Sequence, residues 1–209
     1  MNLKYIFLLI LLSLQSALFA QRSDTVVEYY STGKIKFTGA MIDNQREGTW
    51  TFFYPKGKVS AIEQYKNGQL DGFALYFDTL SYLVSKEQWK KGLEQDSAWF
   101  YYPNGKLKRT GIYYYGMYKG VWCNYYENGK INYFGAYVNG QPNGEWRFYS
   151  PQGILTEVYT YVDGERKGPA SVYTSKGRLE ATGIMDNNLP VGSWDFYNKK
   201  GKVKKVVVY

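Results

Sequence analysis

The sequence predicts an all-β protein: an elongated single sheet made of about seven 24-residue antiparallel β-hairpin repeats. Three glycine landmarks that keep one period indicate this arrangement. The first recurs from Gly48 to Gly192, interrupted by Asp96, and the third recurs from Gly68 to Gly164. The second recurs from Gly33 to Gly201, interrupted by Ser81. A repeat of this length is typical of arrays in which each unit contacts mainly its neighbours.

The first 20 residues have the pattern of a secretory signal peptide. Lys4 supplies the positive charge, Ile6 to Leu14 is apolar, and small residues end at Ala20. The apolar stretch is shorter than the roughly 20 residues that cross a bilayer. We therefore expect residues 1–20 to be removed, leaving a repeat domain over 21–209 without a transmembrane span. The alternatives are an uncleaved anchor or a buried strand. Export places the mature chain in the periplasm, the outer envelope or the medium.

Each repeat contains two strand patterns and two turn patterns. Aromatic runs such as Trp50–Tyr54, bounded by Gly and Pro, are too short for helices and favour strands. The turn Pro55-Lys-Gly-Lys follows, with Gly57 suited to a positive φ angle. A second strand, as in 106–115, then leads to an Asn-Gly type of turn such as Asn67-Gly68. No segment of residues 25–209 has a helical period.

The unit over residues 72–95 departs most from the pattern. Ser81 replaces the turn glycine, and Ala74 stands where other units have Trp. A serine in a left-handed turn costs on the order of 1 kcal/mol. We expect this unit to keep the fold and to be less protected than its neighbours.

Composition excludes several kinds of chemistry. The chain has a formal net charge of +8, 19% aromatic residues, no His and one Cys. Without His there is no His-based acid–base pair and no His-ligated metal. One cysteine, Cys123, forms neither an internal disulfide nor a multi-Cys metal site. We expect no cofactor, no metal and no enzymatic activity.

The repeated units resemble a known family. Residues 120–144 follow the pattern Gly-x-Trp-x-x-Tyr-Tyr-x-Asn-Gly-Lys and then Gly-x-Tyr-x-x-Gly. This pattern resembles the MORN-repeat family, and more closely the exported bacterial MORN repeat variant proteins. The resemblance covers residues 29–209. It implies binding, scaffolding or membrane association. Some of these relatives are labelled YwqK-type antitoxins, a cytoplasmic role that conflicts with an export signal.

Two rows of residues are candidate binding surfaces. One is the tyrosine row: Tyr101, Tyr125, Tyr149, Tyr173 and Tyr197. Its rings can stack on sugars or apolar peptides, or they can simply hold a thin sheet together. The other is the basic row at the Gly-Lys turns: Lys34, Lys58, Lys106, Lys130, Arg178 and Lys202. It can face an anionic surface, or it can be solvated lysine that discourages edge pairing.

Two further sets of residues favour structural roles. Trp50, Trp122, Trp146 and Trp194 are expected in the core. Glu63 and Glu87 share one position in adjacent units, about 10 Å apart. That separation slightly exceeds the carboxyl spacing of glycosidases, so the pair does not favour catalysis.

The leading hypothesis from the sequence is a non-catalytic, exported protein-binding or scaffolding module at the cell envelope. The preferred partner is another protein. The alternative is binding of an anionic lipid head group or a cell-surface polymer through the aromatic and basic rows. Nucleic acid is not expected as a partner, because export removes the chain from it.

Overall fold

The computed structural model describes residues 23–209, and the predicted signal over residues 1–20 lies outside the described residues. The described chain forms strands throughout. In chain order these are β1 (Ser23–Tyr29), β2 (Ile35–Ile42), β3 (Gln45–Phe53), β4 (Val59–Lys66), β5 (Gln69–Phe77), β6 (Leu83–Lys90), β7 (Leu93–Tyr101), β8 (Leu107–Tyr114), β9 (Met117–Tyr125), β10 (Ile131–Val138), β11 (Gln141–Tyr149), β12 (Leu155–Val162), β13 (Glu165–Tyr173), β14 (Leu179–Asp186), β15 (Leu189–Tyr197) and β16 (Val203–Val208).

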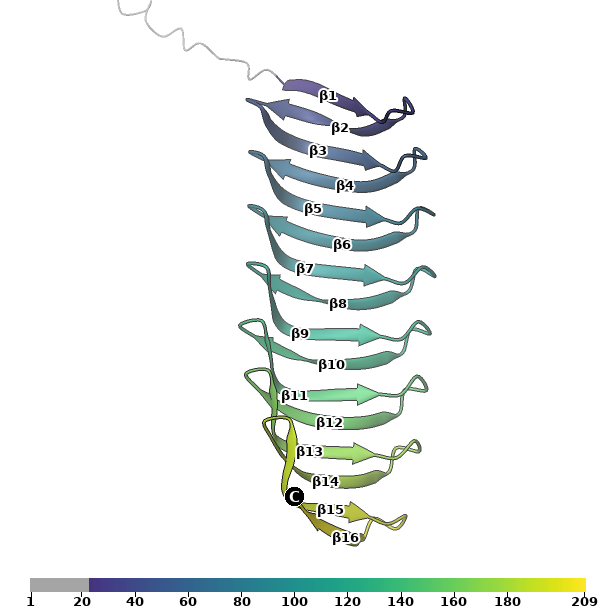
Figure 1. Cartoon of the computed structure of the whole chain (residues 1–209), viewed down its shortest axis with the longest axis vertical. Helices are drawn as coiled ribbons and strands as arrows, with labels where there is room; N and C mark the ends of the chain where they lie inside the picture. Colours follow the sequence, from purple (N-terminus) through teal and green to yellow (C-terminus); the bar gives the residue numbers. More distant parts are fainter. Residues whose placement is uncertain (1–22) are drawn as a thin grey trace, which may run out of the picture.

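All 16 strands belong to one sheet, in which each strand lies next to its neighbours in the sequence. Every pairing is antiparallel, so the sheet is a long, narrow ladder of hairpins (Figure 1). The prediction of an all-β, single-sheet hairpin array is confirmed. Residues 23–209 contain no helix of the length and apolarity needed to span a membrane.

Two kinds of turn line the two long edges of the ladder (Figure 1). The turns after odd-numbered strands are five-residue loops, in which Tyr54 N donates to Lys58 O and Gly57 has φ +89°. The turns after even-numbered strands have two central residues with positive φ, such as Asn67 (49°) and Gly68 (76°). Positive φ at both positions defines the type I′ turn, which matches the twist of the strands. Both predicted turn types are therefore present, and two of the three glycine landmarks lie in them.

The remaining glycine landmark lies inside the odd-numbered strands. Between the pairs Thr38↔Thr51 and Ala40↔Glu47, one residue of β2 faces three residues of β3, and Gly48 there has φ +68°. Such a bulge bends the strand and increases its twist. Asp96 adopts φ +71° at the equivalent position, so the unit without this glycine keeps the same geometry.

The core is one row of residues that crosses the sheet on a single face. We call it the Trp position, and its members are all buried: Trp50, Ala74, Ala98, Trp122, Trp146, Ala170 and Trp194. Trp50 is only 1% exposed in a single-layer sheet. Side chains of the same face cover it, because Phe37, Phe52 and Tyr65 lie 5.6–6.3 Å away between ring centroids. The four predicted core tryptophans are confirmed.

Candidate binding surface

Side chains from four of the eight five-residue turns tie their hairpin to the next one. Tyr30, Tyr54, Tyr102 and Tyr126 each donate a hydroxyl hydrogen bond to the backbone carbonyl 23 residues further on, over 2.7–2.8 Å. Asn104 and Asn128 make a second bond of this kind through their amide groups. This edge of the ladder is therefore held by bonds between consecutive turns.

The predicted basic row takes part in the same network. Lys106 Nζ donates to Asn128 O at 3.1 Å, Lys130 Nζ donates to Gln152 O at 2.6 Å, and Lys34 makes the equivalent bond. Arg178 is exposed, and its backbone N–H donates to Thr174 Oγ1. The lysine ammonium groups therefore have a structural task in addition to their charge. Binding by Lys106, Lys130 and Arg178 stays a prediction.

The tyrosine row is half-buried and makes few contacts within itself. Tyr101, Tyr125, Tyr149, Tyr173 and Tyr197 are all partly covered. Tyr149 stacks on Phe134 at 6.2 Å, and the Tyr197 hydroxyl lies 3.0 Å from Thr182 Oγ1. Burial raises the pKa of the Tyr125 hydroxyl and of the nearby Cys123 thiol. Each ring packs against the sheet, and a binding role for the row stays a prediction.

Glu63 and Glu87 lie on the tryptophan face, one on each side of Ala74, which pairs with both residues. Tyr65 donates to Glu63 Oε2 at 2.6 Å, and Arg46 donates to the Tyr65 hydroxyl. Burial raises the pKa of Glu87. Burial and the negative charges of the two glutamates raise the pKa of Tyr76. The carboxyls therefore occupy space that tryptophan fills in other units, within a hydrogen-bonded cluster.

Surface hollows recur along the opposite edge, beside the type I′ turns, and the rows singled out from sequence do not line them. The larger has a mixed polar and apolar lining and a volume of about 650 Å³. Its lining combines the aromatic rings of Trp89 and Tyr115 with Gln88, Gln95 and Asp71. Aromatic rings with a few convergent polar groups are typical of small-molecule sites.

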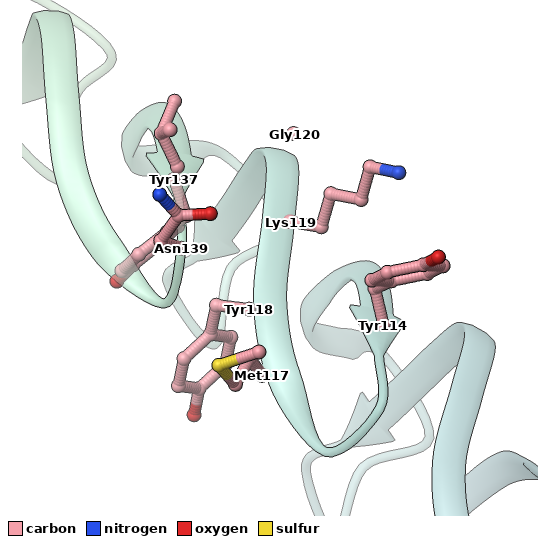
Figure 2. Close-up of a pocket in the computed structure, with 8 residues that line it drawn as sticks. Tyr114, Met117, Tyr118, Lys119, Gly120, Tyr137 and Asn139 are labelled. Carbon is pink, nitrogen blue, oxygen red and sulfur yellow. The ribbon is translucent and has the colours of Figure 1, made fainter.

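The neighbouring hollow is mainly apolar and has a volume of about 410 Å³ (Figure 2). Tyr114, Met117, Tyr118 and Tyr137 line it. Figure 2 shows Met117 beside Tyr118, with Lys119 on the other side of the strand extending toward Tyr114. The Lys119 ammonium lies 4.2 Å from the centre of the Tyr114 ring. Tyr118 and Tyr137 stack at 4.9 Å, so one wall of the hollow is rigid.

The turn between these two hollows contains an unusual residue. Tyr115 adopts φ +49°, where the equivalent residues of the other type I′ turns are Asp, Asn or Lys. Its side chain is 60% exposed, and its ring packs on Tyr114 at 4.5 Å. A bulky residue in the left-handed region is strained, and such strain concentrates at functional sites.

Sequence reasoning missed this turn, although a signal was present. A comparison of the seven type I′ turns shows one aromatic residue at their first central position. The hollows themselves depend on how two units 24 residues apart lie against each other. The bulges in the odd-numbered strands set that arrangement, and the sequence period does not define their geometry.

Comparison with known proteins supports the repeat assignment. Four segments match the family model described as MORN repeat variant: residues 46–67, 100–114, 118–139 and 142–163. No curated protein matches the sequence significantly.

Several solved structures resemble part of the fold at low identity. One is S. aureus TarM in complex with fondaparinux, alpha-GlcNAc-glycerol and UDP, with 18% identity and a TM-score of 0.33. The match covers 52% of this chain and 21% of TarM. A porin-like protein from Bacteroides uniformis has 10% identity and a TM-score of 0.23 over 80% of this chain and 86% of its own. A TcdB2-TccC3-Cdc42 structure has 11% identity and a TM-score of 0.19 over 85% of this chain and 13% of its own.

This chain thus spans about a fifth of the length of TarM. The four segments that match the family model all lie on strands and turns of the hairpin array. The chain is a continuous array of β-hairpins, four segments of which match the MORN repeat variant model.

Proposed function

We propose that the protein is a non-catalytic binding module that recognises another protein through the turn at residues 114–117 and the apolar hollow beside it. The observation that carries the proposal is the exposed cluster of Tyr114, Tyr115 and Met117 at the mouth of that hollow. Tyrosine and methionine are enriched at protein interfaces, and tyrosine buries a large area at low entropic cost. In a thin array, such a cluster offers a contact point.

The strain at Tyr115 supports the same proposal. Placing a non-glycine residue in the left-handed conformation costs roughly 1 kcal/mol. Asparagine tolerates this conformation and stands at the equivalent position in three other turns, at Asn67, Asn139 and Asn187. Tyrosine at this position lowers the free energy of unfolding relative to asparagine. A contact between its ring and a partner accounts for a tyrosine at this position.

The experiment is the substitution Tyr115→Asn in the tagged full chain, followed by crosslinking in its native cell and identification of the captured proteins. We expect the free energy of unfolding to rise by roughly 1 kcal/mol, because the strain is relieved. We also expect the specific crosslinked partner to be lost. A variant that is more stable and no longer captures the partner identifies Tyr115 as a contact residue. A structural residue would lose stability and binding together.

The matched control is Tyr82→Asn, which removes another exposed tyrosine from the opposite edge of the sheet. This control should keep the partner. The proposal fails if Tyr115→Asn captures the same proteins in the same yield as the unchanged chain. It also fails if Tyr82→Asn loses them equally.

We propose that this interaction takes place at the cell envelope, because residues 1–20 are predicted to be an export signal. Proteolytic mapping of the N-terminus of the mature chain tests the export step. A mature chain that begins at Gln21 supports it, and an intact Met1 terminus in the cytoplasmic fraction contradicts it.

A second candidate function is binding of an envelope polymer, and the larger hollow, with its mixed aromatic and polar lining, favours it. Trp89 and Tyr115 supply rings for stacking, while Gln88 and Gln95 supply amide donors and acceptors. A glycan array separates the two candidates. Signals that disappear with Gln88→Leu and Gln95→Leu, and persist with Met117→Gln, favour the polymer.

A further inference from the structure

The two ends of the described sheet each have a strand with one neighbour. β1 pairs with β2, and β16 pairs with β15. The outer edge of each strand therefore presents backbone groups that can extend the sheet. Val203, Val206 and Val208 of β16 are exposed at that end.

Within the repeat, β16 corresponds to an even-numbered strand and β1 corresponds to the odd-numbered strand that follows it. With a 24-residue period, β1 corresponds to residues 47–53 of β3, and β16 corresponds to residues 35–40 of β2. A β16 strand followed by a β1 strand therefore reproduces the pairing of an even-numbered strand with the next odd-numbered strand. The described chain contains seven examples of this pairing, from β2–β3 to β14–β15.

The register of the internal pairs predicts which residues would meet. In β14–β15, Ala181 lies opposite Phe196 and Thr182 lies opposite Asp195. Shifting this register by the repeat brings Lys205 of β16 opposite Glu28 of β1, in a second copy. Val206 then lies opposite Val27. Opposite charges that face each other across strands are favourable, and like charges are not.

Side-chain volume fits the same register. In the junction, Val26 of β1 occupies the Trp position, and Val207 of β16 occupies the position of the residue that faces it. Inside the chain that pair is either small with large, as in Gly39 with Trp50, or large with small, as in Tyr159 with Ala170. In the junction the pair is Val26 with Val207, two side chains of medium size.

We propose that the β16 edge of one copy pairs with the β1 edge of a second copy, so that the chains associate head to tail into a longer continuous sheet. Charge selects this arrangement over the others. β16 carries Lys204 and Lys205, so two β16 edges repel, and β1 carries Asp24 and Glu28, so two β1 edges repel. A head-to-tail interface does not close, and it therefore generates open filaments.

The test is sedimentation velocity of the full chain over a series of concentrations at low salt, with reversal of one charge at a time. Lys205→Glu and Glu28→Lys each place like charges at every junction, so we expect association to weaken about tenfold in each variant alone. An equimolar mixture of the two variants restores association, because each junction between unlike copies again joins opposite charges. The double variant Lys205→Glu/Glu28→Lys also restores it.

Two control variants separate this result from general effects. Glu28 forms an ion pair with Lys36 of its own chain at 2.8 Å, so Lys36→Ala removes that pair and leaves the junction charges intact. Lys176→Glu makes the same charge change as Lys205→Glu on an exposed turn. Both should associate as the unchanged chain does. A chain that stays monomeric at every concentration overturns the proposal, as does a mixture of single variants that fails to reassociate.

Discussion

The identity of each residue in the Trp position follows from the residue that faces it in the preceding strand. Tryptophan occurs where that residue is glycine: Gly39, Gly111, Gly135 and Gly183. Alanine occurs where it is larger: Glu63, Glu87 and Tyr159. A Cβ atom added to Gly135 would lie 2.1 Å from the Trp146 ring. The two positions therefore share one volume, and either can fill it.

This shared volume predicts a strongly non-additive double-mutant cycle. Gly135→Ala should cost about 1–3 kcal/mol through overpacking, and Trp146→Ala about 3–5 kcal/mol through the cavity it leaves. The combination Gly135→Glu/Trp146→Ala recreates the pair Glu63 and Ala74. It should cost less than the sum of its two component changes, Gly135→Glu and Trp146→Ala, each measured alone by urea unfolding. Gly135→Glu alone should be the least stable variant, and simple additivity would contradict the shared volume.

Glu87 predicts a pH effect on stability. Burial raises its pKa in the folded chain, so the charged carboxylate is disfavoured there relative to the unfolded chain. Its contribution is therefore favourable below the unfolded pKa and is lost as pH rises through the folded pKa. Glu87→Gln should stabilise the protein at pH 7, by less than about 1 kcal/mol because the group is half exposed. The gain should shrink in acid, and a gain that is independent of pH would contradict this cause.

At the scale of elements, the five-residue turns fall into two classes according to their first residue. Tyr30, Tyr54, Tyr102 and Tyr126 reach the next turn. Asp78, Ser150, Thr174 and Asn198 instead accept hydrogen bonds from N–H groups of their own turn. A short polar side chain closes its own loop, and a long phenol joins two loops. The second class therefore marks the places where this edge lacks a tyrosine link.

Removal of one such link should loosen the following turn. In Tyr126→Phe the hydroxyl that donates to Tyr149 O at 2.7 Å is absent, and the ring remains. We expect a loss of about 1 kcal/mol, with faster amide exchange confined to residues 149–154. Tyr29→Phe removes an exposed hydroxyl from β1 and should leave exchange in that segment unchanged. Equal exchange at residues 149–154 before and after Tyr126→Phe would show that the bond does not hold the turn.

The strands and turns could be predicted from sequence because their signals are local. Gly57 and Gly68 occupy positive φ, as the Pro-x-Gly and Asn-Gly patterns indicate. The role of Gly48 in a bulge, and the bonds of Lys106 and Lys130 to the next turn, were not predicted. These features depend on the offset between one unit and the next, which the period alone leaves undefined. The hollows beside Tyr115 have the same origin, so a candidate site formed between units was missed.

At the scale of the whole molecule, stability is a chain of contacts between neighbours, because each strand pairs with the strands beside it and packs mainly on them. Such an array can open locally wherever the contacts between units are weakest. Ring contacts are unevenly distributed along it. Trp146 packs on four aromatic rings, whereas residues 66–112 form no ring pair. This segment, in the N-terminal half of the array, thus lacks the ring pairs found on both sides.

The unit over residues 72–95 should therefore be the first part of the array to open. Ala74 occupies the Trp position, Ser81 has φ +77° in place of glycine, and Asp78 closes its own turn without reaching the next. Lys86 compensates in part, with its ammonium 4.3 Å from the Phe73 ring. We expect amides of β5 and β6 to exchange faster than those of β9 and β10 under native conditions. Ser81→Gly should slow exchange in β5 and β6 by relieving the turn, and the idea fails if residues 72–95 are protected as well as 120–143.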